Sequence, residues 1–302
     1  MAKEACALVM IHGLAKKPPN PGIAVERKCV TSASYWADVF YGTDYDTDLA
    51  SYNESAEGMS RAEGVTAANA EVALPVPENE REARFLQQYV AKLSAQPGPP
   101  IAAAGTPAGA GSGYERVPLP AVVKEAIIKR SAVEAYYFLF NKRFRRKDGE
   151  VFDTRSVLRN RLIQDLLKAR EAAERVVLMS HSMGTMIAYD VLRNCAQCPP
   201  VDGFITLGSP LGVDDVQDGL IPEGENKVDY PAQRLTGPWV NVYDTLDVVC
   251  AADPILANDF LRAGTPVIRD INEQNWGSWR HSIAHYLKGP KLRAALRELA
   301  GI

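Results

Sequence analysis

The sequence contains few of the residues that build metal and disulfide sites. Of its 302 residues, four are histidine and five are cysteine, and the single C-x-x-C pair, Cys195 and Cys198, has no second pair to complete it. Zinc sites usually need two such pairs or a group of histidines. Five cysteines in a chain of this length do not form a disulfide framework. We therefore expect no metal and no other cofactor, and a cytoplasmic protein.

Strong net charge and long apolar runs are also missing. The formal net charge is −3, so the chain has no general attraction to nucleic acid or to an anionic membrane, and we expect no nucleic-acid partner. The apolar run Ala5 to Ile11 is too short to span a bilayer and does not have the form of a signal peptide. It predicts a first buried strand.

A short serine motif lies between a predicted strand and a predicted helix. The apolar run 176–179 is typical of a buried strand, and apolar spacings of three and four residues over 183–192 indicate a helix. Between them is Ser180-His181-Ser182-Met183-Gly184, which matches the G-x-S-x-G nucleophile elbow with serine in place of the first glycine. A serine on such a turn presents its hydroxyl at the carboxyl end of the strand. Ser182 is therefore the candidate nucleophile.

An elbow serine needs a base to take its proton, and four histidines are available. His12 belongs to the loop after the first strand. His181 precedes the serine, so its side chain should point away from the hydroxyl. His281 and His285 remain, both between the last predicted strand and the last helix. His281 follows a loop-like stretch, which favours it as the base, with His285 as the alternative.

The base must be oriented by an acid, and the oxyanion needs donors. Two aspartates follow the predicted strand 239–243. Asp247 is the favoured acid and Asp244 the runner-up, although either could instead cap a turn. The expected oxyanion donors are the backbone amides of Met183, after the serine, and of Leu14, in the loop after the first strand.

Predicted strands alternate with predicted helices along most of the chain. This alternation predicts an α/β fold with a mostly parallel sheet and helices on both faces, with the site at the carboxyl ends of the strands. The predicted strands cover 5–11, 28–41, 176–179, 201–207, 239–243 and 265–271, and the helices cover 156–170, 183–192 and 291–300.

Residues 43–149 interrupt this pattern and predict a large insertion into a core formed by 1–42 and 150–302. The insertion contains a helical pattern over 81–93, a flexible segment rich in proline, glycine and alanine over 97–113, and an apolar then basic segment over 119–147. Three interpretations stay open. The insertion could be a cap or lid over the site, a contact for a partner or a membrane surface through 119–147, or a structural helix pair.

Five motifs together resemble the α/β-hydrolase superfamily, closest to bacterial lipase- and esterase-like members of the PGAP1-type and lecithin–cholesterol-acyltransferase-type branches. The resemblance covers 5–41 and 155–302 but not the insertion. The motifs are Ile11-His-Gly-Leu14, Ser180-His-Ser-Met-Gly184, Leu207-Gly-Ser-Pro210, Asp244-x-x-Asp-Val-Val249 and His281-Ser-Ile-Ala-His-Tyr-Leu287.

The resemblance implies an eight-stranded type of sheet, trimmed or decorated in this chain, and ester or acyl chemistry. It also favours His281 as the base, and Ser182, Asp247, His281 is the chain order expected of this fold. We therefore expect a serine esterase or lipase that acts on a small-molecule ester or acyl substrate through an acyl-enzyme. An acyltransferase, an amidase and a non-catalytic binding module stay open as alternatives, and no oligomeric state is predicted.

Overall fold

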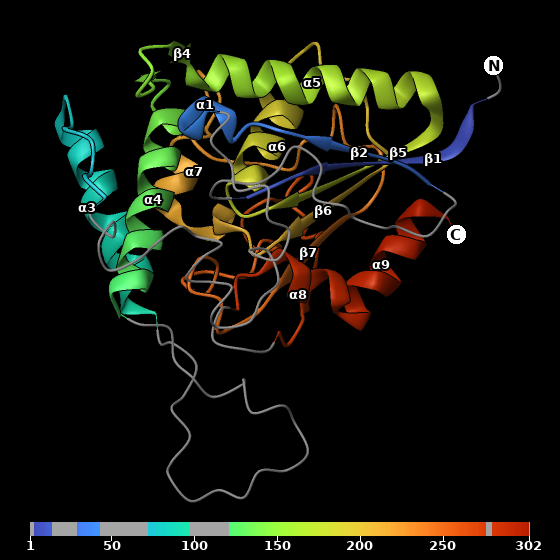
Figure 1. Cartoon of the computed structure of the whole chain (residues 1–302). Helices are drawn as coiled ribbons and strands as arrows, with labels where there is room; N and C mark the ends of the chain where they lie inside the picture. Colours follow the sequence, from blue (N-terminus) through green and yellow to red (C-terminus); the bar gives the residue numbers. More distant parts are fainter. Residues whose placement is uncertain (1–2, 14–28, 43–71, 97–120, 276–279, 302) are drawn as a thin grey trace, which may run out of the picture.

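The computed structural model describes residues 3–13, 29–42, 72–96, 121–275 and 280–301. Within these ranges six strands form one sheet in which every neighbouring pair is parallel (Figure 1). The sheet order is β2-β1-β5-β6-β7-β8. The strands are β1 (Glu4–Ile11), β2 (Cys29–Ser34), β5 (Ala173–His181), β6 (Gly203–Leu207), β7 (Trp239–Tyr243) and β8 (Arg269–Asn272).

The central strands are buried on both faces, which explains their continuous apolar runs. Along β5, Val176 and Leu178 belong to one hydrophobic cluster, whereas Val177 and Met179 belong to a second. Because successive side chains of a strand point to opposite faces, the two clusters lie on the two sides of the sheet. The sequence expectation of a mostly parallel α/β sheet is confirmed.

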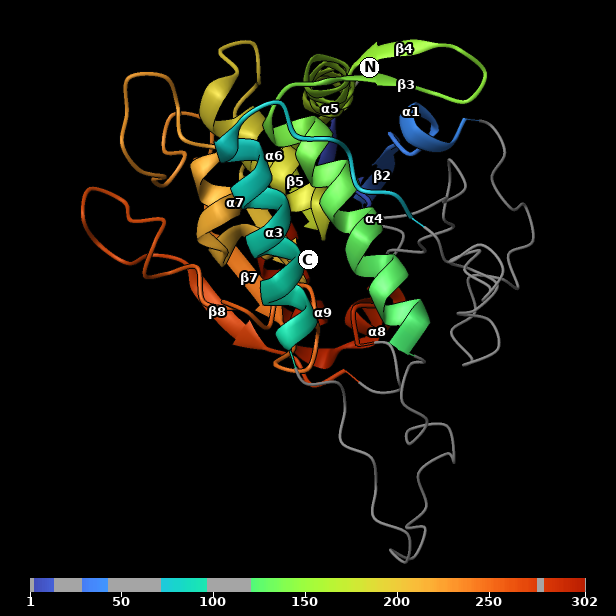
Figure 2. The same cartoon turned by 90° about the vertical axis from the view of Figure 1, so that its left-hand side faces the viewer.

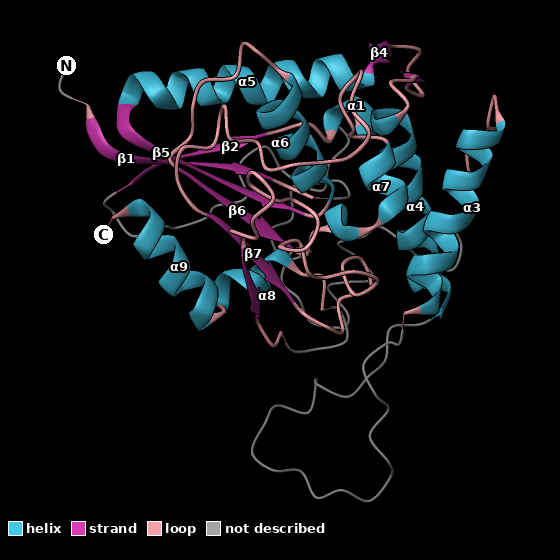
Figure 3. Ribbon diagram, turned by 180° about the vertical axis from the view of Figure 1, so that it is seen from behind, coloured by secondary structure: helices cyan, strands magenta, loops and turns pink. Residues whose placement is uncertain are grey.

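Helices cover both faces of the sheet (Figure 3). α5 (Thr154–Ala172) and α6 (Met183–Asn194) pack through the first cluster, and α9 (Pro290–Ala300) packs through the second. α8 (Ile283–Lys288) precedes α9. Since the strands are parallel, the segments that follow β1, β5, β6, β7 and β8 all begin at one edge of the sheet, where the candidate residues are found.

A buried ion-pair cluster joins α5 to the elbow helix α6. The Asp190 side chain is fully buried and accepts hydrogen bonds from Arg155 Nη2 at 2.6 Å, from Arg159 Nη2 at 2.7 Å and from Asn194 Nδ2 at 2.8 Å. Burial alone would raise the pKa of Asp190, but the two guanidinium groups outweigh burial and lower it. The cluster therefore fixes α6 against the layer of helices behind the sheet.

Two helices of the predicted insertion lie beyond the carboxyl ends of the strands. α3 (Glu80–Ala95) and α4 (Ala121–Leu139) run side by side in front of the sheet in Figure 2. Phe138 and Ala135 of α4 share a hydrophobic cluster with Met186 of α6, so the helix pair is packed onto the core. This position is compatible with a cap, and the role and boundaries of the insertion stay predictions.

Basic residues of the predicted partner segment form ion pairs within the protein. Lys142 Nζ lies 2.7 Å from carboxylate oxygens of both Glu78 and Glu82, and the Tyr136 hydroxyl donates to Glu82 at 2.6 Å. Burial alone would raise the pKa of Glu82, but the Glu78 N–H, which donates to it at 2.8 Å, together with Lys142 and Tyr136 outweighs burial and lowers this pKa to about 2. The cluster joins the start of α3 to the end of α4. The short hairpin of β3 (Arg143–Arg145) and β4 (Val151–Asp153) follows.

Most predicted elements are present, with two corrections. The predicted strand 28–41 ends at Ser34, and its aromatic end forms the short helix α1 (Asp38–Tyr41), which buries Val39 and Phe40. The predicted strand 265–271 begins only at Arg269, because Thr265 pairs back with Arg262 and closes a turn. The described residues also include two short helices, the 3-10 turn η2 (Pro210–Gly212) and α7 (Asp214–Asp218).

The predicted flexible segment 97–113 lies outside the described residues. Among the helices that the structure does describe, none has the length and apolar character needed to cross a bilayer.

Candidate active site

Ser182 lies on a tight turn between β5 and α6, as the motif predicts. Its φ of 56° and ψ of −128° are unusual for a residue with a side chain. Its N–H donates to the Leu207 carbonyl at 3.0 Å, and its own carbonyl accepts from Thr185 Oγ1 at 2.6 Å. These bonds at both ends of the residue hold the strained turn in place.

Small residues let the end of β1 approach this turn closely. A Cβ on Gly184 would lie 2.5 Å from the His12 carbonyl oxygen and 2.9 Å from that of Ile11. A Cβ on Gly13 would lie 2.5 Å from the Cβ of Ser182. All three distances are shorter than non-bonded contacts allow, so glycine is required at both positions.

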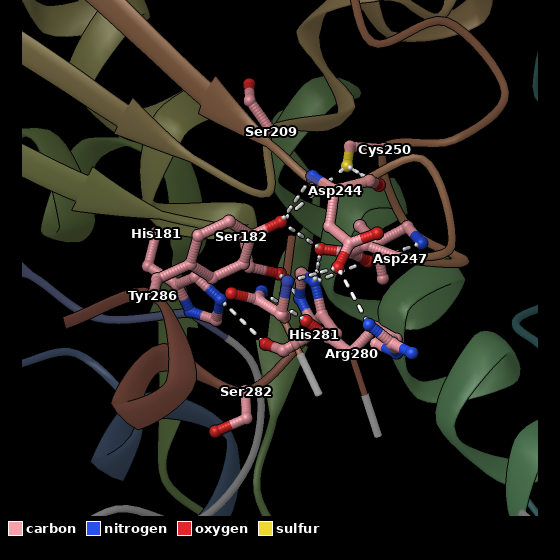
Figure 4. A network of polar contacts seen from close by, with 12 residues as sticks. His181, Ser182, Ser209, Asp244, Asp247, Cys250, Arg280, His281, Ser282 and Tyr286 are labelled. Atoms are coloured by element: carbon pink, nitrogen blue, oxygen red, sulfur yellow. Dashed lines mark hydrogen bonds and ion pairs between the residues drawn. The ribbon is translucent and has the colours of Figure 1, made fainter. Parts of the chain in front are cut away.

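The structure brings together the three residues that the sequence places on separate loops (Figure 4). His281 Nε2 lies 2.7 Å from Ser182 Oγ. On the other side of the ring, His281 Nδ1 lies 2.9 Å from Asp247 Oδ1 and 2.8 Å from Oδ2. All three side chains are buried. Since Nδ1–H donates to the carboxylate, Nε2 carries the lone pair that can accept the proton of Ser182.

The surroundings of Asp247 keep it ionised. Burial alone would raise the pKa of Asp247, but His281, the Val249 amide and the Tyr286 hydroxyl outweigh burial and lower it. The Val249 N–H donates to Oδ1 at 3.0 Å, and the Tyr286 hydroxyl donates to Oδ2 at 2.8 Å. A carboxylate with this set of donors can hold an imidazolium.

The runner-up acid, Asp244, has a different set of partners. Its carboxylate accepts from the amides of Leu246 at 2.8 Å and Asn275 at 2.7 Å and lies 3.6 Å from Arg280 Nη1. Burial raises the pKa of Asp244. Asp244 therefore ties the loop after β7 to the segment that leads to His281, which is the turn-capping alternative that the sequence left open.

His285 and His181 are both buried. His285 lies within α8 and is buried, and its N–H donates to Ser282 Oγ at 3.5 Å. His181 Nε2 donates to the backbone carbonyl of His281 at 2.9 Å, and the two rings are 4.6 Å apart. His181 thus lies against the backbone and ring of the candidate base.

His12, directly after β1, contacts both Trp36 and the neighbouring Gly13. Its ring stacks on Trp36 with the ring centroids 4.8 Å apart, and its Nε2 accepts the Trp36 N–H at 3.2 Å. With Nε2 accepting, Nδ1 carries the proton and donates to the Gly13 carbonyl at 2.7 Å. These contacts fix His12 and Gly13, the described residues after β1, and Gly13 lies beside Ser182.

Of the two predicted oxyanion donors, one lies within the described residues. Met183 is the first residue of α6 and is buried. The amides of the first turn of a helix have no partner within the helix, so that of Met183 suits an oxyanion. Leu14 lies outside the described residues, although Gly13 immediately before it contacts Ser182.

Two residues at the site were not found by the sequence reasoning. Gly208 follows β6 with a φ of +51°, and a Cβ there would lie 2.7 Å from Asp247 Oδ2. Tyr286 contacts Asp247 from α8. Both lie in quoted motifs, Leu207-Gly-Ser-Pro210 and the segment after His281, but nothing in the local pattern indicates what they contact.

No protein-family model and no curated protein matches this chain. The chain is an α/β protein whose described residues form a six-stranded parallel sheet with packed helices.

Proposed function

We propose that the protein is a serine hydrolase of the α/β-hydrolase type that cleaves a carboxylic ester. The observation that carries this proposal is the continuous chain of short contacts from Ser182 Oγ through His281 to Asp247. The strained elbow serine, the low pKa of Asp247 and the position of the site at the carboxyl edge of a parallel sheet support it.

The reaction follows from the direction of these hydrogen bonds. Ser182 Oγ attacks the ester carbonyl carbon while His281 Nε2 takes the hydroxyl proton. The resulting imidazolium is stabilised by Asp247, and the oxyanion is received by the amides of Met183 and, as the sequence predicts, Leu14. His281 then gives the proton to the departing alkoxide, which leaves as an alcohol.

Water completes the cycle. His281 takes a proton from a water molecule, whose oxygen attacks the acyl carbon and forms a second oxyanion. Collapse of that intermediate breaks the bond to Ser182 Oγ, and the serine recovers its proton from His281. If an acceptor alcohol or thiol takes the place of water, the same acyl-enzyme yields a transferase.

The first experiment measures hydrolysis of p-nitrophenyl esters from acetate to palmitate by the wild type, Ser182→Ala and Ser180→Ala. Ser180 is a matched control because it is buried two residues away and its hydroxyl donates to the Ile205 carbonyl at 3.2 Å. We expect Ser182→Ala to lose about 10⁶-fold in kcat and Ser180→Ala to remain active. Added acceptor alcohol tests for a transferase product.

Labelling with a fluorophosphonate provides a second readout. The wild type and Ser180→Ala should be labelled at Ser182, and Ser182→Ala should not be labelled. A folded wild type that neither hydrolyses any ester nor reacts with the fluorophosphonate would contradict the proposal. That result would favour the binding module.

A further inference from the structure

Tyr286 is a buried tyrosine whose hydroxyl lies between the two aspartates of the site. Its side chain is fully buried, and its hydroxyl donates to Asp247 Oδ2 at 2.8 Å. The same oxygen accepts the Asp244 N–H at 3.1 Å and lies 4.0 Å from Cys250 Sγ. The hydroxyl therefore joins the candidate acid to the backbone of the loop that carries it (Figure 4).

The contacts of Asp247 show what this hydroxyl does. Oδ1 accepts from the Val249 amide, Oδ2 accepts from Tyr286, and the Nδ1–H of His281 is shared between the two oxygens at 2.9 and 2.8 Å. One donor on each oxygen fixes the rotation of the carboxylate group. With Tyr286 removed, only Oδ1 would keep a donor besides the imidazole.

The position of Tyr286 in the chain couples it to the base. α8 begins two residues after His281, and Tyr286 lies within it. A movement of α8 would therefore displace the imidazole and the hydroxyl together. Base and acid are thus connected twice, once through the imidazole and once through Tyr286.

The hydroxyl keeps its proton in these surroundings. Burial and the neighbouring groups Asp247 and Cys250 raise the pKa of Tyr286 well above its ordinary value. The other titratable groups near it include Asp244, which pairs with Arg280, as well as His281 and His181, whose ring centroid lies 6.0 Å from that of Tyr286. Tyr286 is therefore a permanent donor to the carboxylate.

We propose that Tyr286 is a positioning residue, whose hydroxyl holds the Asp247 carboxylate in the orientation that receives the His281 imidazolium. This inference rests on the proposed function. The competing explanation is that Tyr286 only packs, since its ring belongs to the hydrophobic cluster on the α9 side of the sheet. Tyr286→Phe separates the two, because it removes the hydroxyl and keeps the ring.

Tyr189→Phe is a closely matched control. The Tyr189 side chain is also fully buried, and its hydroxyl donates to the Asp229 carbonyl at 2.8 Å and accepts the Asp229 N–H at 3.1 Å. Each substitution therefore removes one donated bond and one accepted backbone bond. Only Tyr286 donates to Asp247.

The experiment compares wild type, Tyr286→Phe and Tyr189→Phe in ester hydrolysis and in proton NMR. We expect Tyr286→Phe to lower kcat about 10- to 100-fold with little change in KM, since a hydrogen bond to a charged group is lost. The acid limb of its pH profile should move to higher pH, because an Asp247 carboxylate that has lost the Tyr286 donor stabilises the His281 imidazolium more strongly. Tyr189→Phe should leave kcat and the limb unchanged.

The NMR measurement does not depend on turnover. It follows the low-field Nδ1 proton of His281, identified by its loss in Asp247→Asn, and a shift in Tyr286→Phe but not in Tyr189→Phe is expected. If the wild type hydrolyses esters and Tyr286→Phe matches Tyr189→Phe in every readout, the inference is overturned while the proposed function stands. If the wild type hydrolyses nothing, the proposed function fails and the proton signal alone decides: a shift supports the positioning role, and no shift overturns it.

Discussion

Gly208 allows the sharpest test of the site geometry. It has a φ of +51°, and a Cβ at this position would lie 2.7 Å from Asp247 Oδ2, 3.1 Å from His281 Nδ1 and 3.2 Å from His281 Cε1. The side chain of alanine would therefore enter the contact between the acid and the base. The first of these distances is to a carboxylate held by several donors, so it cannot be relieved by a flexible side chain.

The size of the effect follows from these distances. Non-bonded heavy atoms rest about 3.5 Å apart, so the carboxylate must retreat by about 0.8 Å from the 2.7 Å position. Misplacement of a catalytic group by about 1 Å costs on the order of 100-fold in rate. We therefore expect Gly208→Ala to lower kcat about 100-fold.

Gly224→Ala separates this contact from backbone strain. Gly224 also has a positive φ, +82°, but a Cβ there would have nothing within 4 Å. In both variants alanine must adopt a left-handed backbone conformation, which costs roughly 1–2 kcal/mol of stability. Thermal unfolding measures this loss. Ester hydrolysis at saturating substrate measures kcat for both.

The reasoning would be refuted if Gly208→Ala turned over as fast as Gly224→Ala. An equal loss in the two variants would assign the effect to strain rather than to the contact with Asp247.

Four further substitutions test individual carboxylates. Asp247→Asn should lose about 10⁴-fold in kcat, because Asp247 contacts His281. Asp244 ties two loops together, so Asp244→Asn should lower stability more than turnover. Ester hydrolysis measures the turnover of both variants and thermal unfolding measures their stability. Asp190→Ala should lower the unfolding free energy by about 3 kcal/mol in urea titration, because it leaves two guanidinium groups without their buried partner. The pKa of Glu82 is lowered from 4.5 to about 2, so its stabilisation is complete above pH 4.5 and is lost as the pH falls toward 2. Glu82→Gln should therefore flatten the fall in melting temperature over that range.

Each of these has a control or a contrary result. If Asp244→Asn loses as much turnover as Asp247→Asn, the assignment of the acid is wrong. Glu298→Ala breaks an exposed pair with Arg269 and should cost less than about 1 kcal/mol. A larger loss there than in Asp190→Ala would contradict the role of burial. If the wild type and Glu82→Gln have the same melting profile in acid, the low pKa of Glu82 is contradicted.

Local patterns were sufficient for most of the strands, for the longer helices and for the strand–turn–helix of the elbow, but not for the ends of the strands predicted over 28–41 and 265–271. The strand 239–243 and the helices around 156–170 and 291–300 are found where their apolar periodicity predicts them, because that periodicity depends on neighbours within a few residues. Ser182 could be chosen because the strand, the turn and the helix are contiguous. Elimination of His12 and His181 left His281 and His285 as candidate bases, and position after the strand 239–243 gave Asp247 and Asp244 as candidate acids.

Only the tertiary structure decided between the members of these pairs. Asp244 and Asp247 are three residues apart and chemically identical, but their contacts differ. His281, 34 residues beyond Asp247, lies within hydrogen-bonding distance of the Asp247 carboxylate, whereas the Asp244 carboxylate accepts from the Asn275 amide. Gly208, after β6, lies against Asp247, and Tyr286 contacts it from α8, across 39 residues in each direction. Such contacts depend on the order in which parallel strands pair, which no local pattern encodes. The sequence by itself thus determined which residues are candidates for the chemistry, and the folding of separate loops onto one edge of the sheet decided which of them meet.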